Sequence, residues 1–449
     1  MKKKIFVLLS CVVLSTTSFN VWANSIMDFN PLPIGAQLDP DDEETQVTRK
    51  YSSSEKAALE AAANRWSEIL KPNNSQKANT VVVFNDTVGA AAISDLVEID
   101  GEVYKKSYLN AIINNLSFDD SEIDEEQGHA QILIGSEMAG VTWDTSLNTF
   151  VLPNISAPNL KIVAEHEIFH ALGLASGVSN PEDEEELTFT PNGGPIGIFD
   201  KDLRVSTNYD GSQNSMIGID QVVPEADMIV GENEEFDIVN YSPYYVGLET
   251  LKVLTGTQDA ELTGLNEDQA RELMQEKIAA AGGLVNYSTE YDESGDYPVV
   301  LGLPIHPYDD PDEADLSHIE LRNSFMSHQN YRNWGTLMEA ELALLKDIGY
   351  KNVEVRDHFG KSFYLNSDGN ETVWQGHNDS GIGFGKWNGT EYEASHNTTT
   401  AGVGLHIYGD NYDLVQKSDI LLAGDNSVGV RIDGVENNYT LASGLKLML

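Results

Sequence analysis

The stretch HEIFHALGLASG, residues 166–177, contains two histidines one helical turn apart, with a glutamate directly after the first. Residues four positions apart project from the same face of a helix, so the imidazoles of His166 and His170 can bind one metal ion. Glu167 lies beside them, where its carboxylate can take a proton from a water molecule that zinc makes more acidic. The spacing therefore predicts a zinc site with hydrolytic chemistry, in which Glu167 is the general base.

A catalytic zinc ion usually has three protein ligands and one open position, so a third ligand must come from elsewhere in the chain. Gly173 can take a positive φ and turn the chain just after the second histidine. The residue three positions later, where a third histidine would be expected, is Ser176. The histidines from His358 onward lie in a region of repeats, which leaves three candidates for the third ligand: His306, His318 and His328.

One of these candidates lies in a distinctive segment, LSHIELRNSFMSHQNYRNW (316–334), where Met326 follows His318. Together with the histidine helix, this arrangement resembles leishmanolysin-type metzincins, zinc proteases in which an inserted subdomain separates the second and third histidine ligands. The resemblance implies a Zn²⁺ cofactor and hydrolysis of peptide bonds. It also implies the role of each matching residue: His166, His170 and His318 as zinc ligands, Glu167 as general base, Gly173 as the turn glycine and Met326 as the methionine turn.

The chain as a whole is strongly acidic and begins with a pattern typical of exported proteins. Its formal net charge is −45 over 449 residues, which argues against nucleic acid as a partner, because phosphate binding needs clustered Lys and Arg. Residues 1–23 combine three lysines, an apolar run and a small residue, Ala23, and predict a cleaved signal peptide. Cleavage would remove Cys11, the single cysteine, so we expect an exported protein without disulfides, secreted or at the cell surface.

Patterns of apolar residues predict the elements that position the site. Helical spacing indicates helices over 52–70, 160–174, 266–283 and 335–350, of which the first has a serine cap region and the third begins with an asparagine cap. Runs of β-branched residues indicate strands over 80–86 and 130–136. This mixture predicts an α+β fold, with a metzincin-like zinc protease domain followed by a partial β-solenoid. The predicted divisions are a signal peptide (1–23), a flexible lead-in (24–50), a metalloprotease-like domain (51–353) with an inserted subdomain (about 178–305), and β-solenoid repeats (354–449).

The solenoid is predicted from a change in composition after Tyr350, where Gly, Asn, Asp and short β-rich pieces dominate. The segment GVGLHIYG (402–409) recurs 25 residues later as SVGVRIDG (427–434), and a looser copy, GIGFGKWNG (381–389), precedes both. A period in this range, with one apolar strand per repeat, is typical of stacked β coils. The alternative is an ordinary antiparallel sheet with a chance similarity.

The chain from about residue 50 onward is also similar to the N-terminal passenger regions of bacterial autotransporters. Those regions carry a segment like ELRNSFMSHQNYRNWGTLMEAELALLKDIGY before a β-solenoid. The resemblance implies association with the cell surface through a C-terminal outer-membrane β-barrel. We do not expect the last residues, GLKLML, to supply one, so the chain resembles a passenger without its translocator.

Three functions are compatible with these patterns. The first is an exported zinc-dependent endopeptidase that acts on a protein or peptide substrate. The second is a non-catalytic autotransporter passenger or adhesin that retains a relic zinc helix. The third is a gluzincin-like hydrolase with a downstream glutamate as third ligand, but Gly173 follows His170 too closely for that type of site. The sequence favours the endopeptidase, because it retains Glu167 and several downstream histidines.

Overall fold

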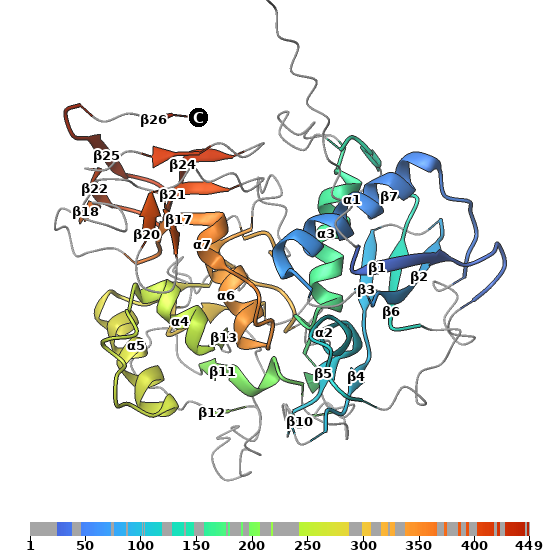
Figure 1. Ribbon diagram of the computed structural model, residues 1–449, viewed down its shortest axis with the longest axis horizontal. Coiled ribbons are helices and arrows are strands. Elements are labelled where there is room, and N and C mark those ends of the chain that lie inside the picture. The colour runs from blue at the N-terminus through green and yellow to red at the C-terminus, as the bar shows by residue number, and fades with distance from the viewer. Residues whose placement is uncertain are drawn as a thin grey trace, which may run out of the picture.

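A computed structural model of the chain gives the arrangement of most of its elements (Figure 1). It describes residues 25–37, 46–72, 76–86, 89–100, 102, 104–118, 128–138, 141–147, 157–176, 178–179, 190–191, 197–206, 217–218, 242–286, 299–306, 316–321, 324–327, 337–365, 372–374, 385–387, 392–394, 402–416, 420–422, 427–444 and 447–448. The expected signal peptide, residues 1–23, lies outside these ranges, as does His328. Helices and several small sheets are mixed along the chain, as the sequence predicts.

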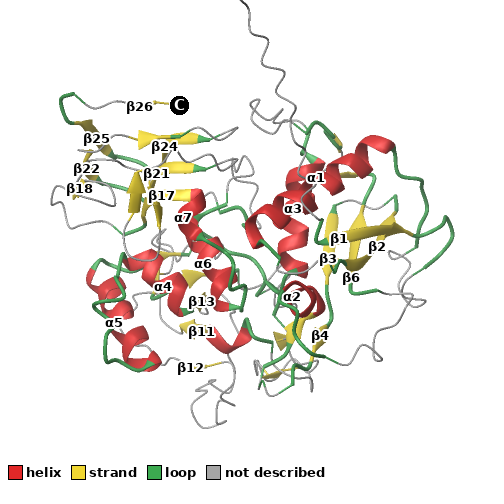
Figure 2. Ribbon diagram, viewed as in Figure 1, coloured by secondary structure: helices red, strands yellow, loops and turns green. Residues whose placement is uncertain are grey.

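The N-terminal part is built on a four-stranded sheet in the order β1-β2-β6-β3. Its strands are β1 (Met27–Pro31), β2 (Ala78–Phe84), β3 (Ala90–Ile93) and β6 (Ala130–Ile134). The first three in spatial order are parallel, and β3 is antiparallel to β6 at the edge. Two helices, α1 (Ser53–Leu70) and α3 (Leu160–Ala171), pack against each other beside this sheet, and α3 contacts β3 (Figure 2).

The expectation of a flexible lead-in over 24–50 is wrong for the part that the structure describes. Met27–Pro31 form β1, which pairs with β2, and the side chains of Ile26, Met27 and Val47 are buried. The segment looks polar because only one face of this edge strand meets the core, so its pattern of burial alternates. With α1 it forms a β-α-β unit that the sequence did not reveal.

The helices begin where their capping residues predict. Ser52 caps α1, and its hydroxyl accepts the N–H of Glu55 while the carboxylate of Glu55 accepts the N–H of Ser52. Asn159 caps α3 in the same manner, without the reciprocal bond. Asn266 and Gln269 form a capping box at the start of α5 (Glu267–Ala280). The caps of α1 and α5 confirm the predictions made from the serine and the asparagine at their starts, whereas the Asn159 cap of α3 was not predicted.

A second sheet lies within the predicted insertion and extends towards the site. Its order is β12-β11-β13-β16, all antiparallel, where β11 is Leu203–Ser206, β12 is Ile217–Gly218, β13 is Ser242–Tyr245 and β16 is Leu303–Pro304. Beyond β16 the pairing continues through a bridge between Ile305 and Ile319. Helix α4 (Leu248–Thr255) contacts β16 and packs against both α5 and α6 (Glu339–Asp347). The segment that carries His318 is therefore the next edge of this sheet.

The C-terminal strands are stacked in parallel (Figure 1). One sheet contains β17 (Phe359–Phe363), β21 (Val403–Tyr408) and β24 (Val428–Asp433); a second contains β18 (Thr372–Trp374), β22 (Asp413–Gln416) and β25 (Asn438–Leu441). Val403 pairs with Val428, so the 25-residue recurrence in the sequence is the register of the sheet. The copy at 381–389 is different: its described residues form β19 (Gly385–Trp387), which pairs antiparallel with β20 (Tyr392–Ala394), and β17 is the neighbour of β21.

The remaining described elements are short. They are β4 (Leu96–Val97), β5 (Lys106–Ser107), α2 (Tyr108–Ile113), β7 (Glu137–Met138), β8 (Val141–Thr142), β9 (Val178–Ser179), β10 (Thr190–Pro191), a 3-10 turn (Asp200–Asp202), β14 (Leu284–Val285), β15 (Val299–Val300), α7 (Val355–His358), β23 (Ile420–Leu421) and β26 (Leu447–Met448). Among the described residues no helix is long and apolar enough to cross a membrane.

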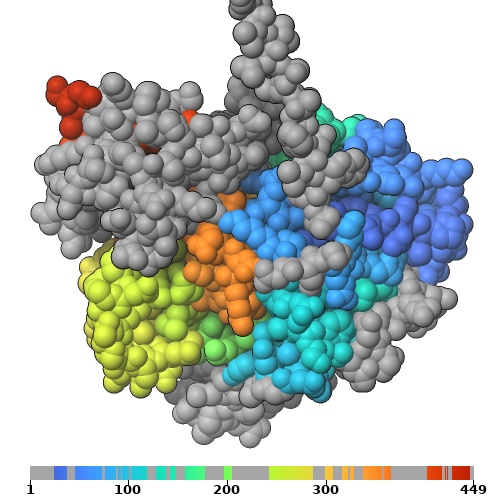
Figure 3. Space-filling model, viewed as in Figure 1, coloured from blue at the N-terminus to red at the C-terminus, as the bar shows by residue number. Residues whose placement is uncertain are grey.

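Helix α6 connects these parts. One hydrophobic core runs from Ile26 to Tyr408 and includes Leu342 and Leu345 of α6. The hydroxyl of Tyr364, just beyond β17, accepts a hydrogen bond from the N–H of Ala340 in the first turn of α6, at 3.0 Å. In the space-filling view, the orange residues around α6 lie between the blue N-terminal part and the yellow helical part (Figure 3). The predicted domain boundary at residue 354 is thus crossed by buried contacts.

Candidate metal centre

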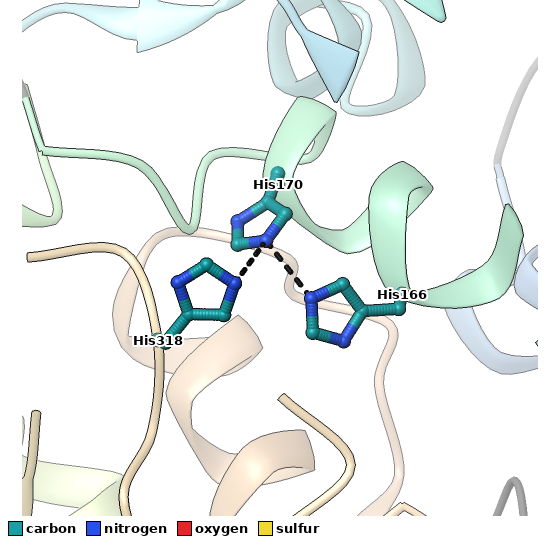
Figure 4. Close-up of side chains that lie close together, drawn as sticks. All are labelled: His166, His170 and His318. Atoms are coloured by element: carbon teal, nitrogen blue, oxygen red, sulfur yellow. Dashed lines mark hydrogen bonds between the residues drawn. The ribbon is translucent and has the colours of Figure 1, made fainter. Parts of the chain in front are cut away.

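Three histidine side chains converge on one point (Figure 4). Nε2 of His170 lies 3.1 Å from Nε2 of His166 and 3.2 Å from Nε2 of His318. Two nitrogens bound to the same zinc ion at 2.0–2.1 Å in tetrahedral geometry are about 3.3 Å apart. The three imidazoles are therefore spaced as the ligands of one metal ion are, and they are the one cluster of this kind among the described residues.

The outer nitrogens of two rings fix which nitrogen faces the centre. Nδ1 of His166 lies 2.9 Å from the carbonyl oxygen of Phe325, and Nδ1 of His170 lies 2.8 Å from that of Leu174. A carbonyl oxygen can only accept, so each Nδ1 carries the hydrogen and each Nε2 presents a lone pair. Two facing lone pairs at about 3 Å repel each other, and a cation between them removes that repulsion. Both the distances and the hydrogen bonds thus favour a bound metal ion.

The edge of the insertion sheet brings His318 to the helix that carries the other two histidines. The N–H of His306 donates to the carbonyl of His318 at 2.8 Å, and the N–H of Glu320 donates to that of Pro304 at 2.9 Å. This short antiparallel pairing holds the backbone of residues 318–320 against residues that end the insertion. The prediction of His318 as the third member of the cluster agrees with this geometry.

His306, the rejected alternative, lies next to the cluster rather than in it. Its ring centroid is 6.4 Å from that of His318, and its Nδ1 is 3.6 Å from Oε1 of Glu320. Both side chains are buried. His306 therefore lies beside His318 without belonging to the cluster, while His328 lies outside the described residues.

Ser176 has a structural partner of its own. Its hydroxyl donates to Oδ1 of Asp200 at 2.6 Å, and Oδ2 of Asp200 accepts the N–H of Gly197 at 3.2 Å. Asp200 is buried and begins the 3-10 turn before β11. The position at which a shorter site would place its third ligand therefore fixes the first part of the insertion to the chain just after α3.

Gly173 makes the turn that the sequence predicts. Its φ is +115°, a conformation that residues with a side chain rarely adopt. A Cβ there would meet nothing closer than 3.6 Å, so the backbone angle rather than lack of space requires glycine. The turn sends the chain back so that the carbonyl of Leu174 meets Nδ1 of His170.

Glu167 is buried on α3 beside the two histidines. Burial raises the pKa of its carboxyl to about 8, and a hydrogen bond from the backbone N–H of Ala92 in β3 opposes that rise. A divalent cation held by the neighbouring imidazoles would lower this pKa by direct attraction. Glu167 is therefore a group that can gain and lose a proton near neutral pH, as a general base requires.

Met326 lies in a tight turn that touches both ligand segments. Its side chain is buried, and its carbonyl accepts the N–H of Ile319, the residue after His318, at 2.9 Å. The preceding carbonyl, that of Phe325, receives Nδ1–H of His166. The methionine turn inferred from the resemblance thus lies against the metal cluster, and its contacts to the histidines run through backbone atoms.

Helix α3, which carries His166 and His170, is also fixed by contacts on its other side. Glu165 is buried and pairs with Arg65 of α1 and with Lys161, whose Nζ is 2.9 Å away. The indole N–H of Trp66 donates to the carbonyl of Glu165 at 2.9 Å. These contacts hold the residue before His166, and only the position of Glu165 next to the motif hinted at them in the sequence.

Comparisons with known proteins identify no relative. No protein-family model, no curated protein and no solved structure matches this chain. The functional argument therefore rests on the geometry of the site and on the residues themselves.

Proposed function

We propose that this protein is an exported zinc-dependent endopeptidase with a metzincin-like catalytic domain. The observation that carries the proposal is the convergence of His166, His170 and His318, two from one helix turn and one from 148 residues further along, beside a buried carboxylate. Three imidazoles with one position left open are the ligand set of a catalytic zinc rather than a structural one.

The residues around the cluster divide the chemistry of peptide hydrolysis among them. Bound zinc supplies a Lewis acid that polarises a carbonyl and makes water more acidic. Glu167 accepts the proton of the attacking water and returns it to the amine that leaves. The carbonyls of Phe325 and Leu174 keep two imidazoles oriented with Nε2 towards the centre.

The substrate we propose is an extended segment of protein or peptide that lies along β3. This strand is the edge of its sheet opposite β1, and its small side chains at Ala90, Ala91 and Ala92 leave room beside the backbone. The N–H of Ala92 donates a hydrogen bond to the carboxylate of Glu167 and not to a carbonyl of β6. The edge of β3 that is not paired with β6 therefore faces the proposed general base. An extended chain added to such an edge would align its peptide bonds with the site.

We further propose that the C-terminal part, residues 354–449, is a partial β-solenoid of an autotransporter-like passenger. The parallel pairing of β21 with β24 and of β22 with β25, each 25 residues apart, supports this assignment. The signal-peptide pattern of residues 1–23 supports export. The alternative is a non-catalytic adhesin that keeps a metal-binding helix, and an activity measurement separates it from the endopeptidase.

The test is Glu167→Gln. The amide cannot accept the proton from water, so the variant should bind as much zinc as the wild type and cleave an unfolded protein substrate about 10²–10⁴-fold more slowly. Zinc is measured by elemental analysis and cleavage by the release of peptides. Equal cleavage by both proteins, or no cleavage by either zinc-loaded protein, would reject hydrolysis at this site.

A further inference from the structure

A buried carboxylate on α6 supports the turn beneath the metal cluster. Glu341 is fully buried, and its Oε1 accepts the hydroxyl of Ser324 at 2.5 Å and the N–H of Met326 at 2.9 Å. Its Oε2 accepts the N–H of Met338, before the first turn of the helix, at 2.6 Å. Burial raises the pKa of the Glu341 carboxyl, and the hydrogen bonds from Ser324 and from the backbone N–H groups of Met338 and Met326 oppose that rise, because N–H donors favour the ionised carboxylate.

The hydrogen bond to Met326 involves the same peptide group that holds His166. The N–H of Met326 and the carbonyl of Phe325 belong to one planar unit, and they point in opposite directions along it. The N–H donates to Glu341, and the carbonyl accepts Nδ1–H of His166 at 2.9 Å. Carboxylate, peptide and imidazole thus form one chain of hydrogen bonds, with the metal-facing Nε2 at its end.

We propose that Glu341 is a positioning residue of the metal centre, which acts on His166 through the peptide group between Phe325 and Met326. This inference rests on the proposed metal site. A negative charge at one end of a hydrogen-bonded chain polarises each group in turn. The Phe325 carbonyl becomes a stronger acceptor, and the imidazole becomes a better electron donor to a metal ion. A carboxylate that accepts a hydrogen bond directly from a ligand histidine has the same effect. Here a peptide group lies between the carboxylate and the imidazole.

The same turn also reaches the third ligand. The carbonyl of Met326 accepts the N–H of Ile319, which follows His318. A turn held by Glu341 therefore fixes a ligand from the helix and a ligand from the sheet relative to each other. Loss of the carboxylate should affect the metal more than it affects the fold, because α6 keeps its apolar face, including Leu342 and Leu345, in the core.

A matched control lies on the same helix. Asp347 is also a carboxylate of α6, half-buried, and its oxygens accept the backbone N–H groups of Glu249 at 2.8 Å and Thr250 at 3.0 Å and the hydroxyl of Thr250 at 2.8 Å. Those amides begin α4, so Asp347 contacts neither the turn nor the histidines through any described bond. Asp347→Asn removes a similar charge from similar surroundings and leaves the chain of hydrogen bonds to His166 intact.

The experiment compares the full-length wild type, Glu341→Gln and Asp347→Asn. Zinc affinity is measured by competition with a chromophoric chelator, ligand geometry by the absorption spectrum of the Co²⁺ form, and stability by urea unfolding of the metal-free proteins. Glu341→Gln should lose about 10–100-fold in zinc affinity and change the Co²⁺ spectrum. Asp347→Asn should lose comparable stability, with zinc affinity within about twofold of the wild type and an unchanged spectrum.

The outcomes separate this inference from the proposed function. A wild type that binds no zinc rejects the metal site itself. A wild type that binds zinc, together with a Glu341→Gln variant of equal affinity and spectrum, rejects the role of Glu341 alone, as does an equal loss of affinity in both variants. If Glu341→Gln does not fold, the Met326 amide resonance of the wild type decides. It should shift on zinc binding while the amides of Glu249 and Thr250 do not, and an unmoved Met326 resonance overturns the proposal.

Discussion

At the scale of single residues, one backbone angle decides where the second ligand points. The φ of +115° at Gly173 sends the carbonyl of Leu174 to Nδ1 of His170. We predict that Gly173→Ala destabilises the protein by about 1–3 kcal/mol, because the new side chain strains this backbone conformation. The same substitution should weaken zinc binding, since the strain is relieved by moving Leu174. Urea unfolding of the metal-free protein and chelator competition measure the two effects.

Gly282 is the control for that substitution. It has a φ of +92°, lies after α5, and a Cβ there would meet nothing within 4 Å. Gly282→Ala should therefore cost a similar amount of stability and leave zinc affinity unchanged. A Gly173→Ala variant that binds zinc as tightly as Gly282→Ala does would show that the turn is not needed to orient His170.

The sequence reveals the residues of the site that follow a local rule and misses those that do not. His166, Glu167 and His170 follow from one helical turn, and Gly173 follows from the turn after it. The sequence showed that Ser176 stands where a third histidine would be expected. Its hydrogen bond to Asp200 could not be predicted, because no sequence pattern links the two segments. The roles of Glu341 and of the Phe325 carbonyl were equally hidden, because a carbonyl oxygen belongs to every residue type and Glu341 lies 15 residues beyond Met326 in the sequence.

At the scale of elements, the stacked C-terminal strands bury a titratable histidine, His406, beside two charged side chains. His406 in β21 is buried, pairs in register with Arg431 of β24, and its Nε2 lies 2.7 Å from Oδ2 of Asp433. Burial lowers the pKa of His406, and the positive charge of Arg431 lowers it further. The hydrogen bond to Asp433 and the more distant charge of Glu339 oppose this shift. The folded protein therefore keeps this imidazole neutral at a pH where the unfolded chain protonates it.

The sign of the resulting pH dependence follows from proton binding. Below the usual His pKa of 6.5, the unfolded chain binds a proton at His406 that the folded chain does not. Stability should therefore fall as the pH drops below about 6.5, by at most about 1.4 kcal/mol per pH unit from this residue. Urea unfolding of the metal-free protein at pH 7 and pH 5.5, followed by a probe in the C-terminal strands, measures the slope.

His406→Gln is the comparison for this effect. The glutamine amide can still donate to Asp433, but it does not titrate in this range. The variant should lose less stability than the wild type between pH 7 and pH 5.5. If both proteins lose the same amount, another group causes the acid sensitivity.

Element prediction succeeded where a helix carried its own start signal or a strand its own repeat. The caps Ser52 and Asn266 and the 25-residue register of β21 and β24 are local in this sense. It failed at β1, whose residues become a strand only because β2 lies beside them. It failed again at 381–389, where similarity to the repeats did not determine the pairing of Gly385–Trp387. Partners far along the chain decided both cases.

At the scale of the whole molecule, a metal at this site would be a cross-link. It would join α3 of the N-terminal part to the edge of the insertion sheet, 148 residues later. A ligand that binds only the folded state stabilises it by about 4 kcal/mol when its free concentration is 1,000 times Kd. We therefore predict that removal of zinc by a chelator lowers the midpoint of thermal unfolding of the wild type by several degrees.

The same chelator should have little effect on His318→Ala, because two imidazoles from one helix do not connect the two parts. Calorimetry of both proteins, with and without the chelator, makes the comparison. An equal drop in the two proteins would place the stabilising metal at some site other than His166, His170 and His318.

The wide separation of the three histidines in the sequence also determines when, during synthesis and folding, the cluster is complete. A chain that has emerged and folded only as far as Leu174 possesses two imidazoles and the general base, but no third ligand. The remaining ligand takes its place once β13 and β16 have paired and the bridge between Ile305 and Ile319 has formed. If the centre is hydrolytic, as we propose, this division would keep it inert in every incomplete chain. The cell that makes the protein would then meet its activity only after the last of these pairings has formed.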